Sequence, residues 1–447
     1  MVKELKISVA GIRGIYPEVL RPDLVQKFAF AYGNFIKEKK IYVGRDTRIS
    51  GNVLKLTVIA SLLACGKNVV DLDIAPTPLV EYVVEKNKKS GGIVITASHN
   101  PFQYNGIKFL SKRGTFLNEK EGQQLIEIYN KGNFLFSKRT GDILIEENIV
   151  EKYFEEIYKN VDNENIKKSN FKIAVDVCQG VGALYTKRFL EKFNCKVEIL
   201  NEKPYGFFSH DPEPKKETLK QLSQYIKEKN VDIGFAQDPD GDRLAIVDEK
   251  GNIIGEELVL AICLDNILEK IKTPVVVNVS TSMIIDYIAN KHGVKVYKTK
   301  IGEVNVVEKM RKVNSLIGGE GNGGVIYAPV HYGRDSFVGM ALILEYMAKK
   351  EKKISEILSD FPIYYTKKEK FEIDSKKINI IMKKLKLKYK KEKIDFTDGM
   401  KIIRKNGWIH IRPSGTEPVL RLVVESTNEK ILNEYFEEFN SFIFEKV

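Results

Sequence analysis

A pattern of strand, polar loop, helix, strand, helix and strand occurs three times along the chain and constrains the fold more than any other feature. The closing strand of each copy delivers a second polar loop. Strands that alternate with helices predict parallel sheets covered by helices on both faces. The three copies run from their first to their closing strand at 40–95, 171–236 and 274–318.

The end of the chain has a different character. Apolar residues recur at helical spacing between Ile378 and Leu385, and Asn406-Gly407 separates two alternating runs, which is a strong hairpin signal. We therefore expect an α/β chain of three similar domains with mixed, largely parallel sheets, followed by a C-terminal α+β domain, around a central cleft. The predicted domains are residues 1–150, 151–255, 256–365 and 366–447.

The composition limits the partners and the compartment. The net charge is +12, but lysines are spread among glutamates as on a solvated surface, so we expect no nucleic-acid partner. No apolar run approaches the roughly 20 residues of a membrane span. No apolar signal segment follows Met1, so we expect a cytoplasmic protein with no membrane partner. Four separated cysteines in apolar contexts are expected to be reduced: Cys65, Cys178, Cys195 and Cys263.

A polar loop, residues 96–101, follows the buried strand that is expected at 91–95. In open α/β sheets ligands bind where strands end. The loop places the Ser98 hydroxyl beside His99, and Lys108 follows ten residues later. Such a serine is either an acyl-transfer nucleophile or a phosphate carrier. Upstream, two glycines are expected to form a tight turn that presents Arg13 either as a phosphate ligand or as a plain surface arginine.

Three aspartates alternate with a proline and a glycine at 238–242. On a tight turn Asp238, Asp240 and Asp242 can converge on one cation, because Mg²⁺ and Ca²⁺ prefer oxygen ligands. A calcium EF-hand is disfavoured, since Arg243 occupies the sixth position, where that loop needs glycine. A plain acidic turn is the other alternative. Mg²⁺ keeps positions open for phosphate oxygens, which favours a phosphate on or near Ser98.

The segment 318–324 contains too many glycines for the interior of a strand. It is either a flexible linker or a loop on which Glu320 and Asn322 bind adjacent sugar hydroxyls. Nearby, residues 298–302 offer cations, and His331 is a weaker candidate for acid/base work.

A second loop near the C-terminus looks like a phosphate cradle, with one arginine, two hydroxyls and backbone N–H groups around a glycine. The alternative is a hairpin connection rich in turn-forming residues. The cradle residues are Arg412, Ser414, Gly415 and Thr416.

Taken together, the loops at 96–101, 238–243, 320–323 and 412–416 resemble the four motifs of the alpha-D-phosphohexomutase family, in that family's order and over nearly the whole chain. The family includes phosphoglucomutases, phosphomannomutases and phosphoglucosamine mutases. One departure is the sequence Gly321-Asn322-Gly323-Gly324 that follows Glu320, where many members have serine followed by glycine and histidine after the glutamate.

The resemblance implies an isomerase, an intramolecular phosphotransferase that interconverts hexose 1- and 6-phosphates. Ser98 would carry a phosphoryl group, with one Mg²⁺ per chain held by that group and the three aspartates. A sugar bisphosphate would be the intermediate and activator, and the substrate would be glucosamine, mannose or glucose phosphate. The protein would be a monomer or a homodimer. A sugar-phosphate-binding protein without catalysis, or a serine hydrolase, are the alternatives.

The same resemblance implies roles for single residues. Ser98, Lys108, His99 and Arg13 would form the catalytic group. Substrate would be held by Arg243, Lys300, Glu320, Asn322, Arg412, Ser414, Gly415 and Thr416.

Overall fold

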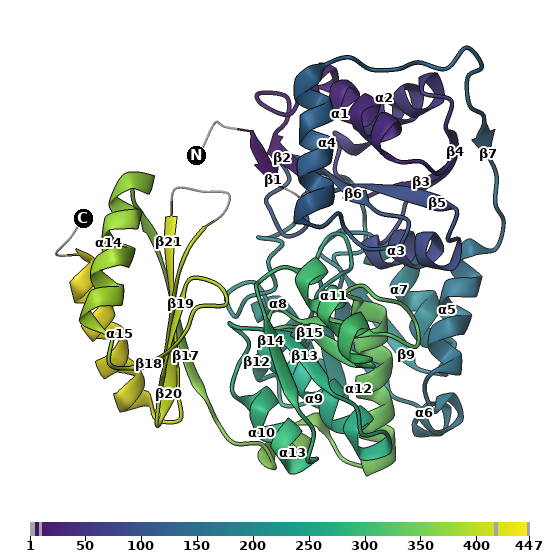
Figure 1. Cartoon of the computed structure of the whole chain (residues 1–447). Coiled ribbons are helices and arrows are strands. Elements are labelled where there is room, and N and C mark those ends of the chain that lie inside the picture. Colours follow the sequence, from purple (N-terminus) through teal and green to yellow (C-terminus); the bar gives the residue numbers. More distant parts are fainter. Residues whose placement is uncertain (1–4, 9–10, 415–418, 445–447) are drawn as a thin grey trace.

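Four β-sheets, each formed by a consecutive part of the chain, organise the protein (Figure 1). The computed structural model describes residues 5–8, 11–414 and 419–444. Domains I, II and III each carry helices on both faces of a mixed sheet, and domain IV carries helices α14 and α15 on one face of an antiparallel sheet. The predicted fold class is therefore confirmed, while the exact domain boundaries stay predictions.

Domain I has seven strands in the order β1-β2-β6-β5-β3-β4-β7. Strands β5, β3, β4 and β7 pair in parallel, and β1, β2 and β6 add an antiparallel edge. Its elements are β1 (Lys6–Ser8), β2 (Gly11–Ile15), α1 (Pro22–Phe35), β3 (Lys40–Arg45), α2 (Gly51–Ala64), β4 (Asn68–Ile74), α3 (Thr77–Lys86), β5 (Ser90–Ile95), β6 (Tyr104–Leu110), α4 (Glu119–Lys131) and β7 (Ile143–Leu144).

Domains II and III repeat the parallel centre with antiparallel closing strands, in the orders β12-β11-β10-β8-β9 and β14-β13-β15-β16. Domain II consists of α5 (Ile149–Lys159), α6 (Asn163–Ser169), β8 (Lys172–Asp176), α7 (Gly182–Glu191), β9 (Lys196–Leu200), α8 (Lys220–Lys229), β10 (Ile233–Gln237), β11 (Leu244–Val247) and β12 (Ile253–Gly255). Domain III consists of α9 (Glu257–Lys270), β13 (Val275–Asn278), α10 (Ile284–Lys291), β14 (Val296–Thr299), α11 (Glu303–Val313), β15 (Ile317–Glu320), β16 (Gly324–Tyr327), α12 (Ser336–Lys350) and α13 (Ile354–Ser359).

Domain IV contains the predicted hairpin as β19 and β20, in the strand order β17-β21-β20-β19-β18. Alternate residues of β20 and β21 point into a separate apolar core with α14 and α15, so the other face of the sheet is turned toward the rest of the protein (Figure 1). Its elements are β17 (Tyr365–Glu372), α14 (Ser375–Lys388), β18 (Lys393–Asp395), β19 (Met400–Arg404), β20 (Gly407–Pro413), β21 (Val419–Ser426) and α15 (Glu429–Phe444).

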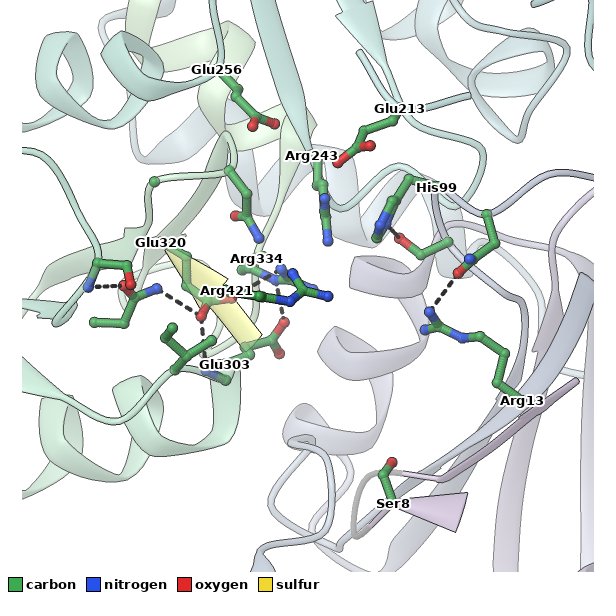
Figure 2. A pocket seen from close by; sticks show the side chains of 18 of the residues that line it. Ser8, Arg13, His99, Glu213, Arg243, Glu256, Glu303, Glu320, Arg334 and Arg421 are labelled. Carbon is green, nitrogen blue, oxygen red and sulfur yellow. Dashed lines mark hydrogen bonds and ion pairs between the residues drawn. The ribbon is translucent and has the colours of Figure 1, made fainter. Parts of the chain in front are cut away.

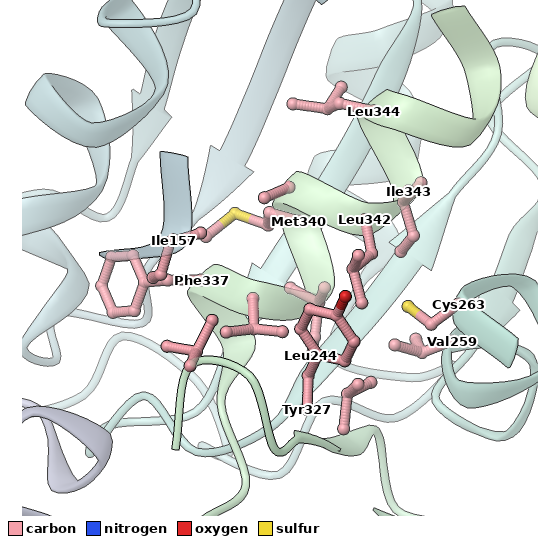
Figure 3. Close-up of a cluster of buried hydrophobic side chains, with 14 of the residues drawn as sticks. Ile157, Leu244, Val259, Cys263, Tyr327, Phe337, Met340, Leu342, Ile343 and Leu344 are labelled. Atoms are coloured by element: carbon pink, nitrogen blue, oxygen red, sulfur yellow. The ribbon is translucent and has the colours of Figure 1, made fainter. Parts of the chain in front are cut away.

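One large apolar core joins domains I, II and III. Helix α12 lies at its centre and is buried from Ser336 to Ala348, and Figure 3 shows Phe337, Met340 and Leu344 of this helix among side chains from neighbouring elements. None of the helices in the described part of the chain has the length and apolar character that a membrane crossing requires. All four cysteines are free thiols.

Two local predictions were wrong. Arg13 lies inside strand β2 rather than on a turn, because 11–15 pairs with both β1 and β6. Gly318 and Gly319 lie inside β15. A side-chain carbon at Gly318 would lie 2.4 Å from the Val276 carbonyl oxygen, so this part of β15 needs glycine to pair with its neighbours.

We expect Leu344→Ala to lower the free energy of unfolding by about 3–5 kcal/mol, because it leaves a cavity in the shared core. Urea unfolding followed by circular dichroism measures the change. Leu184→Ala on α7 is the matched control, since Leu184 is 46% exposed and Leu344 is fully buried. Equal losses in the two variants would contradict the placement of α12.

Candidate active site

A cavity of about 600 Å³ lies where the four domains meet. Domain I lines it with Ser98, His99 and Lys108, and domain II with Arg243. Domain III contributes the turn between β15 and β16, and domain IV contributes β17, β20 and β21. The predicted central cleft is therefore present, and loops that are far apart in the sequence open into it.

The serine loop follows β5 and is held by a buried arginine. Arg48 has no exposed surface and donates hydrogen bonds of 2.6 to 2.9 Å to four carbonyl oxygens of this loop and the start of β6, those of Ser98, Asn100, Pro101 and Tyr104. Ser98 has a φ of +49°, a strained conformation for a residue with a side chain. The arginine therefore maintains a backbone geometry that would otherwise relax.

The Ser98 hydroxyl is the contact between the serine loop and the aspartate loop. It donates a 2.9 Å hydrogen bond to Asp238 Oδ2 and lies 3.3 Å from Nδ1 of His99. Ser98 and Asp238 are both buried. The two motifs that the sequence separates by 140 residues are therefore in direct contact.

The three aspartates form one buried cluster whose carboxylate oxygens lie within 4.8 Å of one another. Asp240 Oδ2 accepts 2.8 Å hydrogen bonds from Thr77 and Lys108, and Asp242 Oδ2 accepts one of 2.6 Å from Arg334. The remaining oxygens, Asp240 Oδ1 and Asp242 Oδ1, are buried without a hydrogen-bond partner, and Arg243 Nε lies 3.8 Å from the second. Buried, unpartnered carboxylate oxygens fit a hard divalent cation such as Mg²⁺.

The ionisable groups of the cluster shift one another's pKa values. Burial raises the pKa of Asp238 well above its usual value, and the charges of Asp240 and Asp242 raise it further. Burial also opposes ionisation of Asp240, but Lys108 beside it holds the pKa of that carboxyl well below its usual value. Burial alone would lower the pKa of Lys108, yet Asp240 and Asp242 raise it. A bound divalent cation would offset the remaining repulsion among the three carboxyls.

Arg334 joins the aspartate loop to the sugar-loop glutamate. Its guanidinium donates to Asp242 at 2.6 Å, to Glu320 at 3.0 Å and to Glu303 at 2.7 Å. Glu320 also accepts hydrogen bonds from Asn278 and from the Gly302 backbone. Figure 2 shows Arg334 beside Glu320 and Glu303, with Arg243 between them and His99.

Three of the other predicted residues line the cavity, and Lys300 does not. Arg13 lines the cavity and donates a 2.5 Å hydrogen bond to the Asn100 side chain. Asn322 lines the cavity, and so does Arg412, which pairs with Asp398 at 3.2 Å. The Lys300 side chain is exposed and does not line the cavity, although its neighbours Ile301 and Gly302 do.

The phosphate loop is only partly described. The Ser414 backbone N–H donates to the Val419 carbonyl at 2.9 Å. Gly415 and Thr416 lie outside the described residues. His331 is buried, does not line the cavity and hydrogen-bonds Asp335 at 2.9 Å, so its contacts are those of a structural residue.

Sequence reasoning missed several residues of this site. Arg48 and Arg334 organise it, and His410 and Arg421 line the cavity from domain IV. Burial lowers the pKa of His410 to about 4, so its ring is neutral between Ser280 and the Asp398 carbonyl. Arg48 follows the polar end of a strand, which is a usable signal, and Arg334 lies in the polar run 331–335, in which His331 was singled out instead.

Comparisons with known proteins agree with this arrangement. Family models of phosphoglucomutase/phosphomannomutase match four successive parts: alpha/beta/alpha domain I at 4–136, domain II at 151–251, domain III at 255–364 and the C-terminal domain at 366–441. Together they show that the chain belongs to the phosphoglucomutase/phosphomannomutase family, and they confirm the resemblance to the alpha-D-phosphohexomutases.

Individual relatives match nearly the whole chain. A Thermococcus kodakarensis phosphoglucomutase/phosphomannomutase is 39% identical, and the match covers 96% of each chain. A Sulfurisphaera tokodaii phosphoglucosamine/phosphogalactosamine mutase is 34% identical over 97% of this chain and 98% of its own. A crystal structure of a Burkholderia thailandensis protein of the same family shares the fold, with a TM-score of 0.86, 24% identity and 98% of both chains covered.

Arg48→Lys tests the clamp on the serine loop. We expect it to lower the free energy of unfolding by about 2–4 kcal/mol, because an ammonium group cannot bond all four carbonyl oxygens. Arg45→Lys, at the end of β3, is the matched control. It should cost under about 1 kcal/mol, since Arg45 pairs with a half-exposed aspartate, Asp73. Similar losses in thermal unfolding would contradict the role of Arg48.

Asp240→Asn tests the cation site. We expect it to weaken Mg²⁺ binding at least about tenfold in isothermal titration calorimetry, because it removes charge from the only such cluster found among the described residues. Asp232→Asn, just before the same strand β10, should leave Mg²⁺ binding unchanged. Unaltered binding in Asp240→Asn would refute the assignment.

Proposed function

We propose that this chain is a phosphohexose mutase that interconverts hexose 1- and 6-phosphates through a phosphoserine at position 98 and a bisphosphorylated sugar. The 2.9 Å contact between the Ser98 hydroxyl and Asp238, at the wall of a cavity lined by all four domains, carries the proposal. A hydroxyl that can carry a phosphoryl group then lies on the same cluster as the oxygens of Asp240 and Asp242 that have no hydrogen-bond partner, which is an arrangement suited to metal-assisted phosphoryl transfer.

The residues of the chain position the reactants. Asp238, Asp240 and Asp242, with a phosphoryl oxygen on Ser98, would hold one Mg²⁺, which supplies charge neutralisation. Lys108 adds a fixed positive charge 2.8 Å from Asp240. His99, with Nδ1 3.3 Å from the Ser98 oxygen, is placed to move a proton.

The substrate is held by cavity residues that come from all four domains. Glu320 and Asn322 bind sugar hydroxyls, and Arg243 and Arg13 contact the reacting phosphate. Arg412 and its loop bind the phosphate that is not reacting. After the first transfer, the bisphosphate turns over in the cavity and Ser98 takes back the other phosphoryl group. The names of the relatives favour glucosamine, mannose or glucose phosphate as the substrate.

Ser98→Ala should lower kcat at least about a thousandfold and leave the fold intact, because the phosphoryl carrier is lost. A coupled assay with the 1-phosphates of glucose, mannose and glucosamine measures the rate and ranks the substrates. Ser61→Ala, a buried serine on α2, is the control and should stay within about twofold of the wild type. A near-normal rate in Ser98→Ala would overturn the mechanism.

Mass spectrometry of the purified protein separates the alternatives. Phosphate on Ser98 supports the mutase and argues against a binding protein without catalysis. Labelling of Ser98 by a fluorophosphonate, without phosphate, would instead indicate a serine hydrolase.

A further inference from the structure

Glu81, on the inner side of α3, is a buried carboxyl group without a hydrogen-bond donor. It has no exposed surface, and neither of its oxygens has a partner. A side-chain carbon at Gly333 would lie 2.1 Å from Glu81 Oε2, so the carboxyl is also tightly enclosed by backbone. Buried polar groups are normally paired, and an ionised carboxylate in such a place is costly. The proposed mechanism does not use this residue.

A second acid, Glu303 at the start of α11, contacts the same segment: Glu81 Oε2 packs against Gly333, and the next residue, Arg334, bonds Glu303. Glu303 Oε2 accepts a 2.7 Å hydrogen bond from Arg334, whereas its Oε1 is buried without a donor. Burial raises the pKa of Glu81 well above its usual value, and the charge and hydrogen bond of Glu303 raise it further. Two ionised carboxylates in a buried place without donors for their free oxygens would repel each other, so one of the two is expected to hold a proton.

The proton belongs on Glu81. Glu303 already accepts a charged hydrogen bond from Arg334, which favours its ionised form, whereas Glu81 has no cation in hydrogen-bonding contact among the described residues. A protonated Glu81 then donates the hydrogen bond that Glu303 Oε1 lacks. One shared proton would therefore pair one oxygen of each carboxyl group.

We infer that Glu81 is a positioning residue for the proposed reaction: its protonated carboxyl orients Glu303, which in turn fixes Arg334 between Asp242 and Glu320. The inference rests on the proposed function. Arg334 bonds Oδ2 of Asp242 and leaves Oδ1 for the cation, so its orientation affects both the aspartate cluster and the sugar-binding glutamate.

Loss of the proton from Glu81 would place a second negative charge beside Glu303. The groups that face Glu81 come from several elements, and only part of the new charge would be offset. They are Glu303 and Arg334 of domain III, Lys108 of β6, Asp242 of the aspartate loop, Tyr153 of α5 and His331. Activity should therefore fall as the pH rises through the pKa of Glu81.

The test compares pH profiles of kcat/KM between about pH 6 and pH 10. Glu81→Leu should lose at least about tenfold at neutral pH, because Glu303 keeps an unpaired oxygen. Glu81→Gln should rescue activity to within about threefold, since its amide donates the same hydrogen bond, and its alkaline decline should move by about one pH unit or disappear. Glu85→Gln, one turn along α3, should keep the wild-type profile.

Two results would overturn the inference: a Glu81→Gln profile that overlays that of the wild type at alkaline pH, or a neutral-pH loss equal to that of Glu81→Leu. Infrared difference spectra of wild type minus Glu81→Gln give a readout that does not need turnover. A protonated-carboxyl band at neutral pH supports the pair, and its absence refutes it. If the wild type converts none of the three sugar phosphates, the proposed function fails. The infrared band still shows whether Glu81 is protonated.

Discussion

Three carboxylates held together in a buried pocket are the constraint on which the rest of the site depends. Like charges at this separation repel strongly where water is excluded. Lys108 and Arg334 offset part of that repulsion with their charges, and Thr77 donates a further hydrogen bond to Asp240. Lys108 and Thr77 belong to domain I, and Arg334 belongs to domain III. The aspartate loop of domain II therefore binds side chains of domains I and III, and these contacts fix the three domains relative to one another.

The loops that carry these charges extend from domains that share one apolar core. Domains I, II and III share one cluster of buried side chains, so the serine loop, the aspartate loop and Glu320 stand on one packed body. Domain IV has its own core and meets domain III through polar contacts, such as the 2.6 Å bond between Ser280 and His410 and the bond from Lys401 to the Val279 carbonyl. The reacting groups are therefore on the common body, and the predicted phosphate loop is on the separately packed domain.

The sequence predicted the parts of the site that have local patterns. Polar loops after apolar runs located Ser98 and the aspartates, and alternation with turn residues located the hairpin of domain IV. Interactions between distant segments had no such signal. Arg334 reaches Asp242 across 92 positions, and Glu81 belongs to none of the motifs in the sequence. The glycines of β15 were misread, because their role depends on the strands that pair with them.

The most direct test of the central claim is a crystal structure of the Ser98-phosphorylated protein with Mn²⁺ in place of Mg²⁺. The account predicts one anomalous-scattering peak bound by Asp238, Asp240 and Asp242 and by an oxygen of the phosphate on Ser98. A peak away from the three aspartates, or a phosphoserine whose oxygens do not reach the ion, would contradict it.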